Sequence, residues 1–265
     1  MHTRMELLLT GLTQPKGEAF ALEVEKRVLQ MERRFNRFDA RSPLAVLNSR
    51  GASGSVEVDD ELFMALELCE VFRVATKGYF SVATSSSSVD VMPYRLDAKL
   101  HGVELTSQDV QIDMGGFAKG FALEQVVQMV RESGAASALL NFGNSSVAAV
   151  GHHPYGEWWS VGVENTKNVG VSACEVHLRD SAMSVSGRST SGEYHIVNPH
   201  TGVKVAQDEL ILVEGRSALV AEVLSTALYA APKAERGTIM QQFEGYRASE
   251  IYCHRHGGAE QRRIE

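Results

Sequence analysis

Three stretches of the chain carry apolar residues at helical spacing. Over residues 16–35 the apolar positions share one side of a helix. A second helix is predicted over 61–77, because an aspartate pair before it can cap its start and Gly78 can end it. A third, over 217–231, is apolar almost all round, which predicts that it is buried.

Short apolar or alternating runs predict the strands. In order they are residues 4–11, 109–113, 136–142, 147–151, 157–163 and 173–178. A helix over 120–133 joins the second and third of these in a βαβ pattern, whereas the last two alternate like strands of an antiparallel sheet. Residues 84–88 are predicted to form a small polar loop, and 184–202 is rich in turns. Helices and strands are mixed without strict alternation, which favours the α+β class.

Composition narrows the class of protein. The 265 residues suffice for one large domain or two intimate ones. The net charge of −7 argues against a nucleic-acid binder, which should carry a basic patch. No apolar run approaches the length of a transmembrane helix. The start, MHTRMELLLTG, does not resemble a signal peptide, so we expect a cytoplasmic protein or a leader outside this sequence.

The three cysteines do not indicate a metal or redox motif. Cys69, Cys174 and Cys253 are odd in number, far apart in sequence and form no C-x-x-C pair. We expect them to be small buried side chains.

The segment DMGGFAKGF is the first candidate site. Gly115 and Gly116 let the backbone approach a ligand, the predicted helix start attracts anions, and Lys119 adds a positive charge. Neither the P-loop nor the dinucleotide-binding pattern is present. The segment therefore indicates a phosphate or carboxylate site, or a tight strand-to-helix turn with a solvated lysine.

Glu222 is the second candidate, because it is the only charge within the apolar helix 217–231. A buried carboxylate must be paired, protonated or bound to a metal. Thr226 lies one turn further on, so the two side chains offer oxygen ligands to Mg²⁺. The alternative is a solvent-facing strip of Glu222, Ser225 and Thr226.

Two loops complete the candidates. The turn-rich segment 184–202 holds His195 and His200, and loops of this kind often build sites, although a lone histidine is more often structural. The segment NFGNSS contains Gly143 and suits either a polar ligand or, more commonly, a tight turn.

These segments, in this order, resemble the FAD:protein FMN transferase family, also called ApbE. DMGGFAKGF is similar to the family's D-L-G-G-[IV]-A-K-G-[YF], and NFGNS stands at its N-x-G-G-D. SVSG and HIVNPHTG resemble its S-G…H-[IV]-[IV]-[DN]-P-x-T-G, and AEVLSTA resembles its A-D-x-x-[AS]-T-A. MERRFNRFDARSPLAVLN and the opening MHT also match family segments, so the resemblance covers nearly the whole chain.

The resemblance implies a fold and an activity. The fold is α+β and related to the T-fold, with mixed sheets packed against helices in a single domain, 1–265, or in two intimate sub-domains with the FAD site between them. The activity is Mg²⁺-dependent transfer of FMN from FAD to a threonine hydroxyl, with release of AMP. The acceptor is a flavoprotein subunit of a redox complex. Family members usually work outside the cytoplasm, often as lipoproteins, which leaves the compartment open.

The resemblance also implies roles for individual residues. Lys119 faces the pyrophosphate, and His195 is the base for the threonine. The metal ligands are the Ala118 carbonyl, Glu222 and Thr226. The residues that bind FAD are Met1, Phe38, Asp113, Gly115, Gly116, Lys119, Gly143, Ser186, Gly187 and His195.

Several carboxylates of the family pattern are replaced. Glu222 stands for an aspartate, and Ser81, Ser145 and Asn198 stand where acids are common. Three functions therefore stay open: FMN transfer, FAD binding without transfer, and hydrolysis of FAD to FMN and AMP.

Overall fold

The computed structural model describes residues 3–84, 92–188 and 194–265. Its α-helices are α1 (Gln14–Phe35), α2 (Pro43–Arg50), α3 (Asp60–Ala75), α4 (Ala118–Glu132), α5 (Ala218–Ala230) and α6 (Lys233–Met240), and a 3₁₀ turn spans Gly51–Ser53. The helices α1, α3 and α5 follow the predicted segments closely, and α4 begins two residues before its predicted start.

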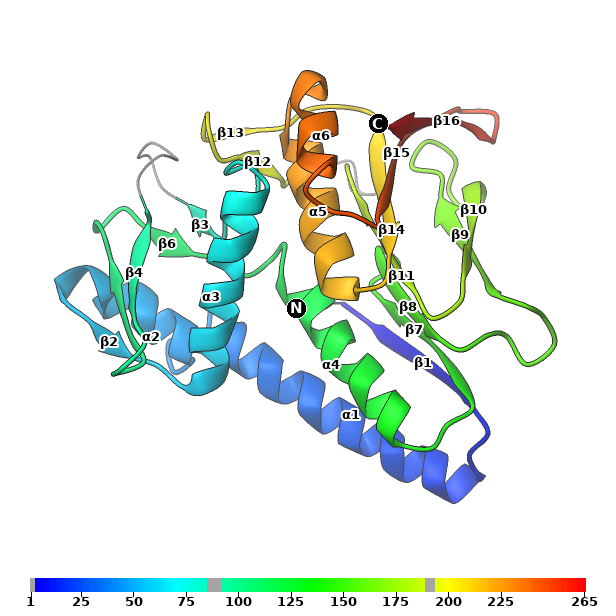
Figure 1. The fold of residues 1–265 in the computed structure, drawn as a ribbon, viewed down its shortest axis with the longest axis horizontal. Coiled ribbons are helices and arrows are strands. Elements are labelled where there is room, and N and C mark those ends of the chain that lie inside the picture. The colour runs from blue at the N-terminus through cyan, green and yellow to red at the C-terminus, as the bar shows by residue number, and fades with distance from the viewer. Residues whose placement is uncertain (1–2, 85–91, 189–193) are drawn as a thin grey trace.

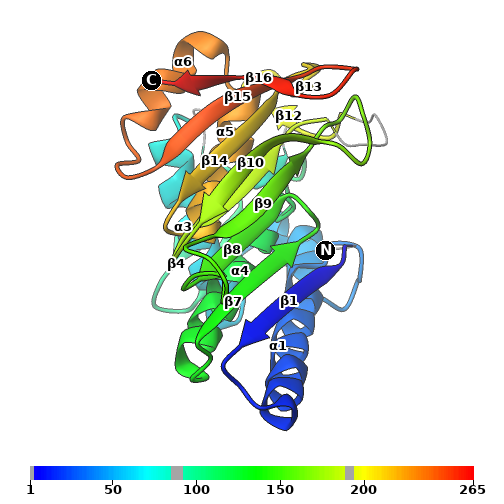
Figure 2. The same ribbon diagram turned by 90° about the vertical axis from the view of Figure 1, so that its right-hand side faces the viewer.

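A seven-stranded antiparallel sheet forms the centre of the fold (Figures 1 and 2). Its order is β1 (Met5–Thr10), β7 (Ser137–Phe142), β8 (Ser146–Val150), β11 (Ala182–Ser186), β14 (Leu210–Gly215), β15 (Arg247–Cys253) and β16 (Ala259–Ile264). Helices α4 and α5 cover one face, and the hairpin of β9 (Trp159–Glu164) and β10 (Ser172–Leu178) covers the other. The mixture of sheets and helices confirms the α+β prediction.

Both faces of the central strands are buried, which hides the usual alternation. In β8, Val147 and Ala149 pack under the hairpin, whereas Ala148 and Val150 pack under the helices. Because successive side chains point to opposite faces, a strand covered on both sides is apolar throughout.

Helix α3, helix α2 and the small sheets lie to one side of α4 and α5, and the long helix α1 runs below α4 (Figure 1). The small sheets are β2 (Val56–Glu57) with β5 (Gly102–Leu105) and β4 (Tyr94–Asp97), β3 (Ala83–Thr84) with β6 (Gln111–Ile112), and β12 (Val197–Asn198) with β13 (Val203–Lys204). Asn48 of α2 holds β6 directly ahead of residues 113–119 (DMGGFAK), the lysine loop. Its amide donates to the Ile112 carbonyl at 2.9 Å and its oxygen accepts from the Ile112 N–H at 2.7 Å.

Several local predictions need correction. The strand predicted over 109–113 is only β6, and it pairs with β3 rather than with β7, so no parallel βαβ unit forms. The start of the turn-rich segment is part of strand β11. Thr84 belongs to β3 instead of a loop, and residues 85–88 lie outside the described residues. Cys69 and Cys253 are buried as expected, but Cys174 is partly exposed.

Helices α4 and α5 cross closely because Gly120 has no side chain. A Cβ added there would lie 2.6 Å from Glu222 Cβ and 2.8 Å from the Ala218 carbonyl oxygen. The neighbouring Lys119 is thereby held against α5.

We expect Gly120→Ala to destabilise the protein by about 1–3 kcal/mol, the usual cost of overpacking. The free energy of unfolding, measured with urea, checks this. Gly17→Ala is the matched control, because it is also helical but a Cβ there meets nothing within 4 Å. That control should stabilise the protein by roughly 0.5–1 kcal/mol. Equal effects of the two substitutions would contradict the close crossing.

Candidate functional site

A cavity of about 800 Å³ opens where the lysine loop, the end of β11 and helix α5 meet. This volume falls in the range of small-molecule and cofactor sites, roughly 300–1,000 Å³. Residues on the α1–α3 side also reach it, namely Arg37, Tyr79 and Phe80.

Most of the predicted site residues line this one cavity. They are Asp113, Gly115, Gly116, Lys119, Gly143, Ser186, Gly187, His195, Glu222 and Thr226. Ala118 is buried and Phe38 is 76% exposed, and neither lines the cavity. Met1 lies outside the described residues.

Glu222 is buried, with only 3% of its surface exposed, and it is paired. Its Oε1 lies 2.6 Å from the ammonium nitrogen of Lys119. Its Oε2 accepts hydrogen bonds from the Ser184 hydroxyl at 2.8 Å and from the Ser146 hydroxyl. The alternative of a solvent-facing strip is therefore wrong.

Strand register explains how two hydroxyls reach the same carboxylate oxygen. Ser146 of β8 and Ser184 of β11 are direct partners across the antiparallel pair, so their side chains share one face of the sheet. Helix α5 packs on that face and presents Glu222 to both. No local sequence signal predicts this pairing, because the three residues come from three separate elements.

A chain of hydroxyls continues from Glu222 toward the cavity. Ser225 donates to the Ser184 hydroxyl at 3.1 Å, and its oxygen lies 2.8 Å from that of Ser186. The hydroxyl of Thr226 lies 3.4 Å from Ser186. Gly116 lies directly beside Thr226, since a Cβ added there would be 3.4 Å from the threonine oxygen. The glycine thus leaves the threonine hydroxyl accessible from the lysine loop.

The donor set defines which cation this region can hold. Glu222 and Thr226 supply hard oxygen atoms, which Mg²⁺ prefers. Within residues 3–84, 92–188 and 194–265, no three His, Cys, Asp or Glu side chains gather as a metal cluster. Mg²⁺ commonly uses one or two carboxylates together with water and substrate phosphates. The residues therefore fit a Mg²⁺ ion that completes its coordination with water molecules and, when substrate is present, with a phosphate, and not a site built from several protein carboxylates.

Arg37 is a cavity residue that the sequence analysis did not identify. Its guanidinium lies 3.4 Å from the Asp113 carboxylate and 4.8 Å from the ring centre of Phe38. In the part of the chain that the structure describes, its buried Nε has no hydrogen-bond partner. The local pattern F-N-R-F offers no reason to choose this arginine, because its partner Asp113 is distant in the sequence and comes close only in the folded chain.

The two histidines of the turn-rich segment differ in environment. His195 is exposed and lines the cavity. His200 instead bonds through Nε2 to the Lys77 carbonyl at 3.0 Å and packs on the Tyr79 ring. His200 therefore ties its loop to the end of α3, and only His195 is placed to meet a ligand.

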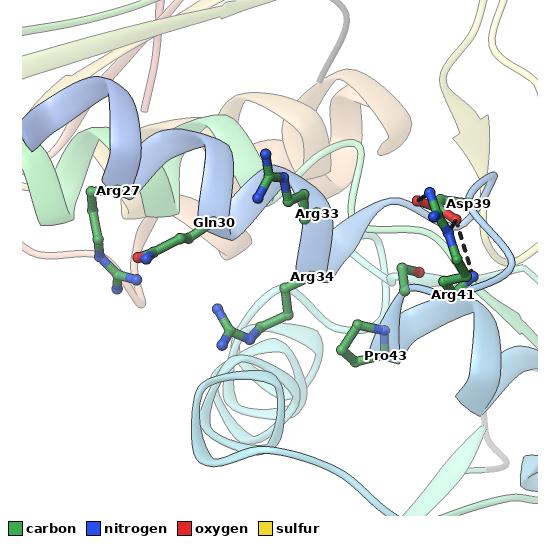
Figure 3. A pocket seen from close by; sticks show the side chains of 8 residues that line it. Arg27, Gln30, Arg33, Arg34, Asp39, Arg41 and Pro43 are labelled. Carbon is green, nitrogen blue, oxygen red and sulfur yellow. Dashed lines mark hydrogen bonds and ion pairs between the residues drawn. The ribbon is translucent and has the colours of Figure 1, made fainter. Parts of the chain in front are cut away.

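A second cavity, of about 780 Å³, lies along α1 and the start of α2 (Figure 3). Arginines dominate its lining, but three of them are neutralised. Arg27 pairs with Glu61, Arg34 with Asp59 and Glu61, and Arg41 with Asp39. The uncompensated positive charge is small, so the first cavity is the stronger candidate site.

The described helices include none that is long and apolar enough to cross a membrane.

Sequence comparison identifies relatives over most of the chain. The model of the ApbE family matches residues 1–249. The FAD:protein FMN transferase of Treponema pallidum (strain Nichols) is 26% identical over 258 residues, which cover 80% of this chain and 71% of that protein. The protein of the same name from Haemophilus influenzae is 26% identical over 134 residues, covering 45% of this chain and 37% of the relative.

Structure comparison agrees with the sequence comparison. The ApbE protein of Thermotoga maritima gives a TM-score of 0.81 at 19% identity, with 100% of this chain and 97% of that chain covered. The apo form of the flavinyl transferase ApbE from Pseudomonas stutzeri gives 0.79 at 18% identity, covering 99% and 95%. These likenesses confirm the predicted ApbE-like fold. Together with the family match over nearly the whole length, they show that the chain belongs to the ApbE family.

Proposed function

We propose that this chain transfers FMN from FAD to the hydroxyl of a threonine in an acceptor flavoprotein and releases AMP. The observation that carries the proposal is the cavity whose lining combines Lys119, Glu222 and Thr226 with Gly115 and Gly116. Family membership and the names of the relatives support it. The acceptor we infer is a flavoprotein subunit of a redox complex.

The lysine loop is suited to a pyrophosphate. Gly115 and Gly116 precede the first turn of α4, where backbone N–H groups and the helix dipole favour an anion. Lys119 contributes a full positive charge from within that first turn. Asp113 accepts from the Gly115 N–H at 2.9 Å, which fixes the loop ahead of the helix.

Glu222, Thr226 and the Ala118 carbonyl are the groups that would hold Mg²⁺ next to the pyrophosphate. When bound, the metal would offset the charge that develops on the departing AMP phosphate. The protein's own part is to hold these oxygen atoms on two helices that cross at Gly120.

His195 is the base in this proposal. Its imidazole removes the proton from the acceptor threonine as the threonine oxygen bonds to the phosphorus of the FMN moiety. The bond between that phosphorus and the bridging oxygen breaks at the same time, and AMP leaves with the electron pair. The exposed position of His195 at the cavity suits a proton that comes from another protein.

We infer that the flavin lies between the two sides of the cavity, which would make 1–265 one domain or two intimate sub-domains. Tyr79 offers aromatic surface on one side. Phe38 lies on the loop after α1 with Arg37 against its ring, where it can close over a flavin. Met1 is assigned to the same region by the resemblance alone.

The test is to incubate the chain with FAD and Mg²⁺, with and without a threonine-bearing acceptor domain, and to separate the products by HPLC. AMP together with covalent flavin on the acceptor supports transfer. AMP and free FMN without acceptor would show a pyrophosphatase instead. FAD that stays intact with several acceptors would show a binding protein without transfer activity.

We expect His195→Ala to slow flavin transfer by about 10²–10⁴-fold, the usual contribution of a general base. The effect on FAD affinity should be smaller than the effect on the rate, because the proton transfer belongs to the chemical step. His200→Ala is the matched control, since His200 contacts the Lys77 carbonyl rather than the cavity. Unchanged transfer by His195→Ala would remove this residue as the base.

A further inference from the structure

The carboxylate of Glu222 is already engaged before any ligand arrives. Lys119 lies 2.6 Å from Oε1, and Ser184 and Ser146 both donate to Oε2. A carboxylate offers about four lone-pair positions, so three of them are in use. A metal ion that binds Glu222 must therefore enter an existing network.

Of the two partners in this ion pair, Lys119 is the freer one, although its ammonium also donates to the hydroxyls of Ser145 at 2.9 Å and Ser146 at 3.0 Å. Glu222 is 3% exposed, and its Cβ lies at the crossing point of α4 and α5, where Gly120 leaves no spare room. The Lys119 side chain is 22% exposed, lines the cavity and has a flexible four-carbon stem. Because Glu222 is fixed, a metal ion has to bind at its present position, and Lys119 is the group that the metal can displace.

Lys119 and Mg²⁺ would occupy the same region. Mg²⁺ binds its oxygen ligands at about 2.0–2.1 Å, which would place it close to an ammonium that already contacts the same carboxylate. Two cations at that spacing repel each other, and burial weakens the screening. Among the described residues, Glu222 is the one carboxylate within ion-pair distance of Lys119, so the lysine has no second acid to move to.

We propose that Lys119 is an internal counter-ion of Glu222 which the metal displaces, and that the released ammonium moves to the FAD pyrophosphate. The inference rests on the proposed function, because it assigns the metal to Glu222. Lys119 holds the buried carboxylate in place in the metal-free protein. The metal would then neutralise the Glu222 carboxylate, and the Lys119 ammonium would neutralise the pyrophosphate, so that each anion keeps a cation.

The test is a titration of the protein with Mg²⁺ in the absence of FAD. Calorimetry measures the Mg²⁺ affinity, and the thermal unfolding temperature is recorded with and without Mg²⁺. Lys119→Met removes the competitor and keeps a side chain of similar length, so it should bind Mg²⁺ at least about tenfold more tightly than the parent protein. Mg²⁺ should also raise the unfolding temperature of Lys119→Met more than that of the parent. Lys119→Arg keeps the charge and should respond like the parent.

Two further variants make the result specific. Lys77→Met removes the surface partner of Glu235, a 3.1 Å pair outside the cavity, and should leave Mg²⁺ affinity unchanged. Glu222→Gln should abolish Mg²⁺ binding in the parent and in the Lys119→Met background. Mg²⁺ affinity of Lys119→Met equal to or weaker than that of the parent overturns the proposal.

Mg²⁺ binding that survives Glu222→Gln also overturns it, because the two cations would then have no shared ligand. The flavin-transfer assay is a separate readout. If the protein transfers flavin but Lys119 and Mg²⁺ do not compete for Glu222, the proposed function stands and this inference is wrong. If they compete but no flavin is transferred, this inference stands and the proposed function is wrong.

Discussion

Replacing Glu222 by glutamine should lower the rate of flavin transfer by about 10²–10³-fold, the scale of losing one preorganised electrostatic group from an active site. The amide matches the carboxylate in shape, and its NH₂ group can donate to the serine hydroxyls on the β8–β11 pair. What it lacks is the negative charge that holds Lys119 and would hold Mg²⁺. The fold should persist, because Lys119 is 22% exposed and can turn into the cavity.

Single-turnover AMP release and flavin incorporation into the acceptor measure this effect. The control is Glu235→Gln, which removes the carboxylate of the exposed Lys77 pair and should leave transfer unchanged. Circular dichroism of both variants reports whether the fold is kept. A folded Glu222→Gln protein with the full Mg²⁺-dependent rate would show that Glu222 has no part in the reaction.

Replacing Arg236 by methionine should destabilise the protein by about 3–5 kcal/mol, the cost of removing one partner of a buried ion pair. Arg236 is 1% exposed and pairs with Glu209 at 3.5 Å and with Glu250. It also donates to the Leu228 carbonyl at 2.8 Å, near the end of α5. Methionine would leave two carboxylates and a carbonyl without this donor.

Urea unfolding measures this loss, and Arg247→Met is the control. Arg247 pairs with Glu214 at 3.2 Å but is 65% exposed, so its removal should cost no more than about 1 kcal/mol. Equal losses in the two variants would contradict the view that burial makes the Arg236 network sensitive.

The same network predicts a pH dependence. Burial raises the pKa of Glu250, but hydrogen bonds from Tyr252 and Arg236 outweigh it and hold that pKa below the usual 4.5. An acid with a lowered folded-state pKa stabilises the protein above its unfolded-state pKa, and this contribution is lost as pH falls through the folded-state value. Arg236→Met should therefore lose less stability than the parent on acidification below about pH 4.5.

Local sequence patterns determined many of the elements. The apolar face of 16–35 became α1, and the alternation in 157–163 and 173–178 became the β9–β10 hairpin. These signals are local, because helix and strand periodicity follows from backbone geometry within a few residues. The motifs around Lys119 and Glu222 also indicated the family, and they marked most of the residues that line the cavity.

Other strands lack the apolar–polar alternation that marks a strand in the sequence. In β14 the run from Leu210 to Val213 is buried on both faces, so it shows no alternation. The edge strand β16 is mostly polar, and its place in the sheet depends on pairing with β15. The predicted βαβ unit does not form for a related reason. Which strands pair in a sheet depends on contacts between distant parts of the chain, and β6 pairs with β3.

The sequence by itself determined the four longer helices α1, α3, α4 and α5, the α+β class and the resemblance to the ApbE family, whereas the short helices α2 and α6 were not predicted. It left Glu222 as paired, protonated, metal-bound or solvent-facing. Only the tertiary structure decided that Glu222 is buried and paired with Lys119, and that Arg37 meets Asp113. The physical reason is that the charge state and partners of a side chain depend on burial and on neighbours from distant elements, which periodicity cannot encode.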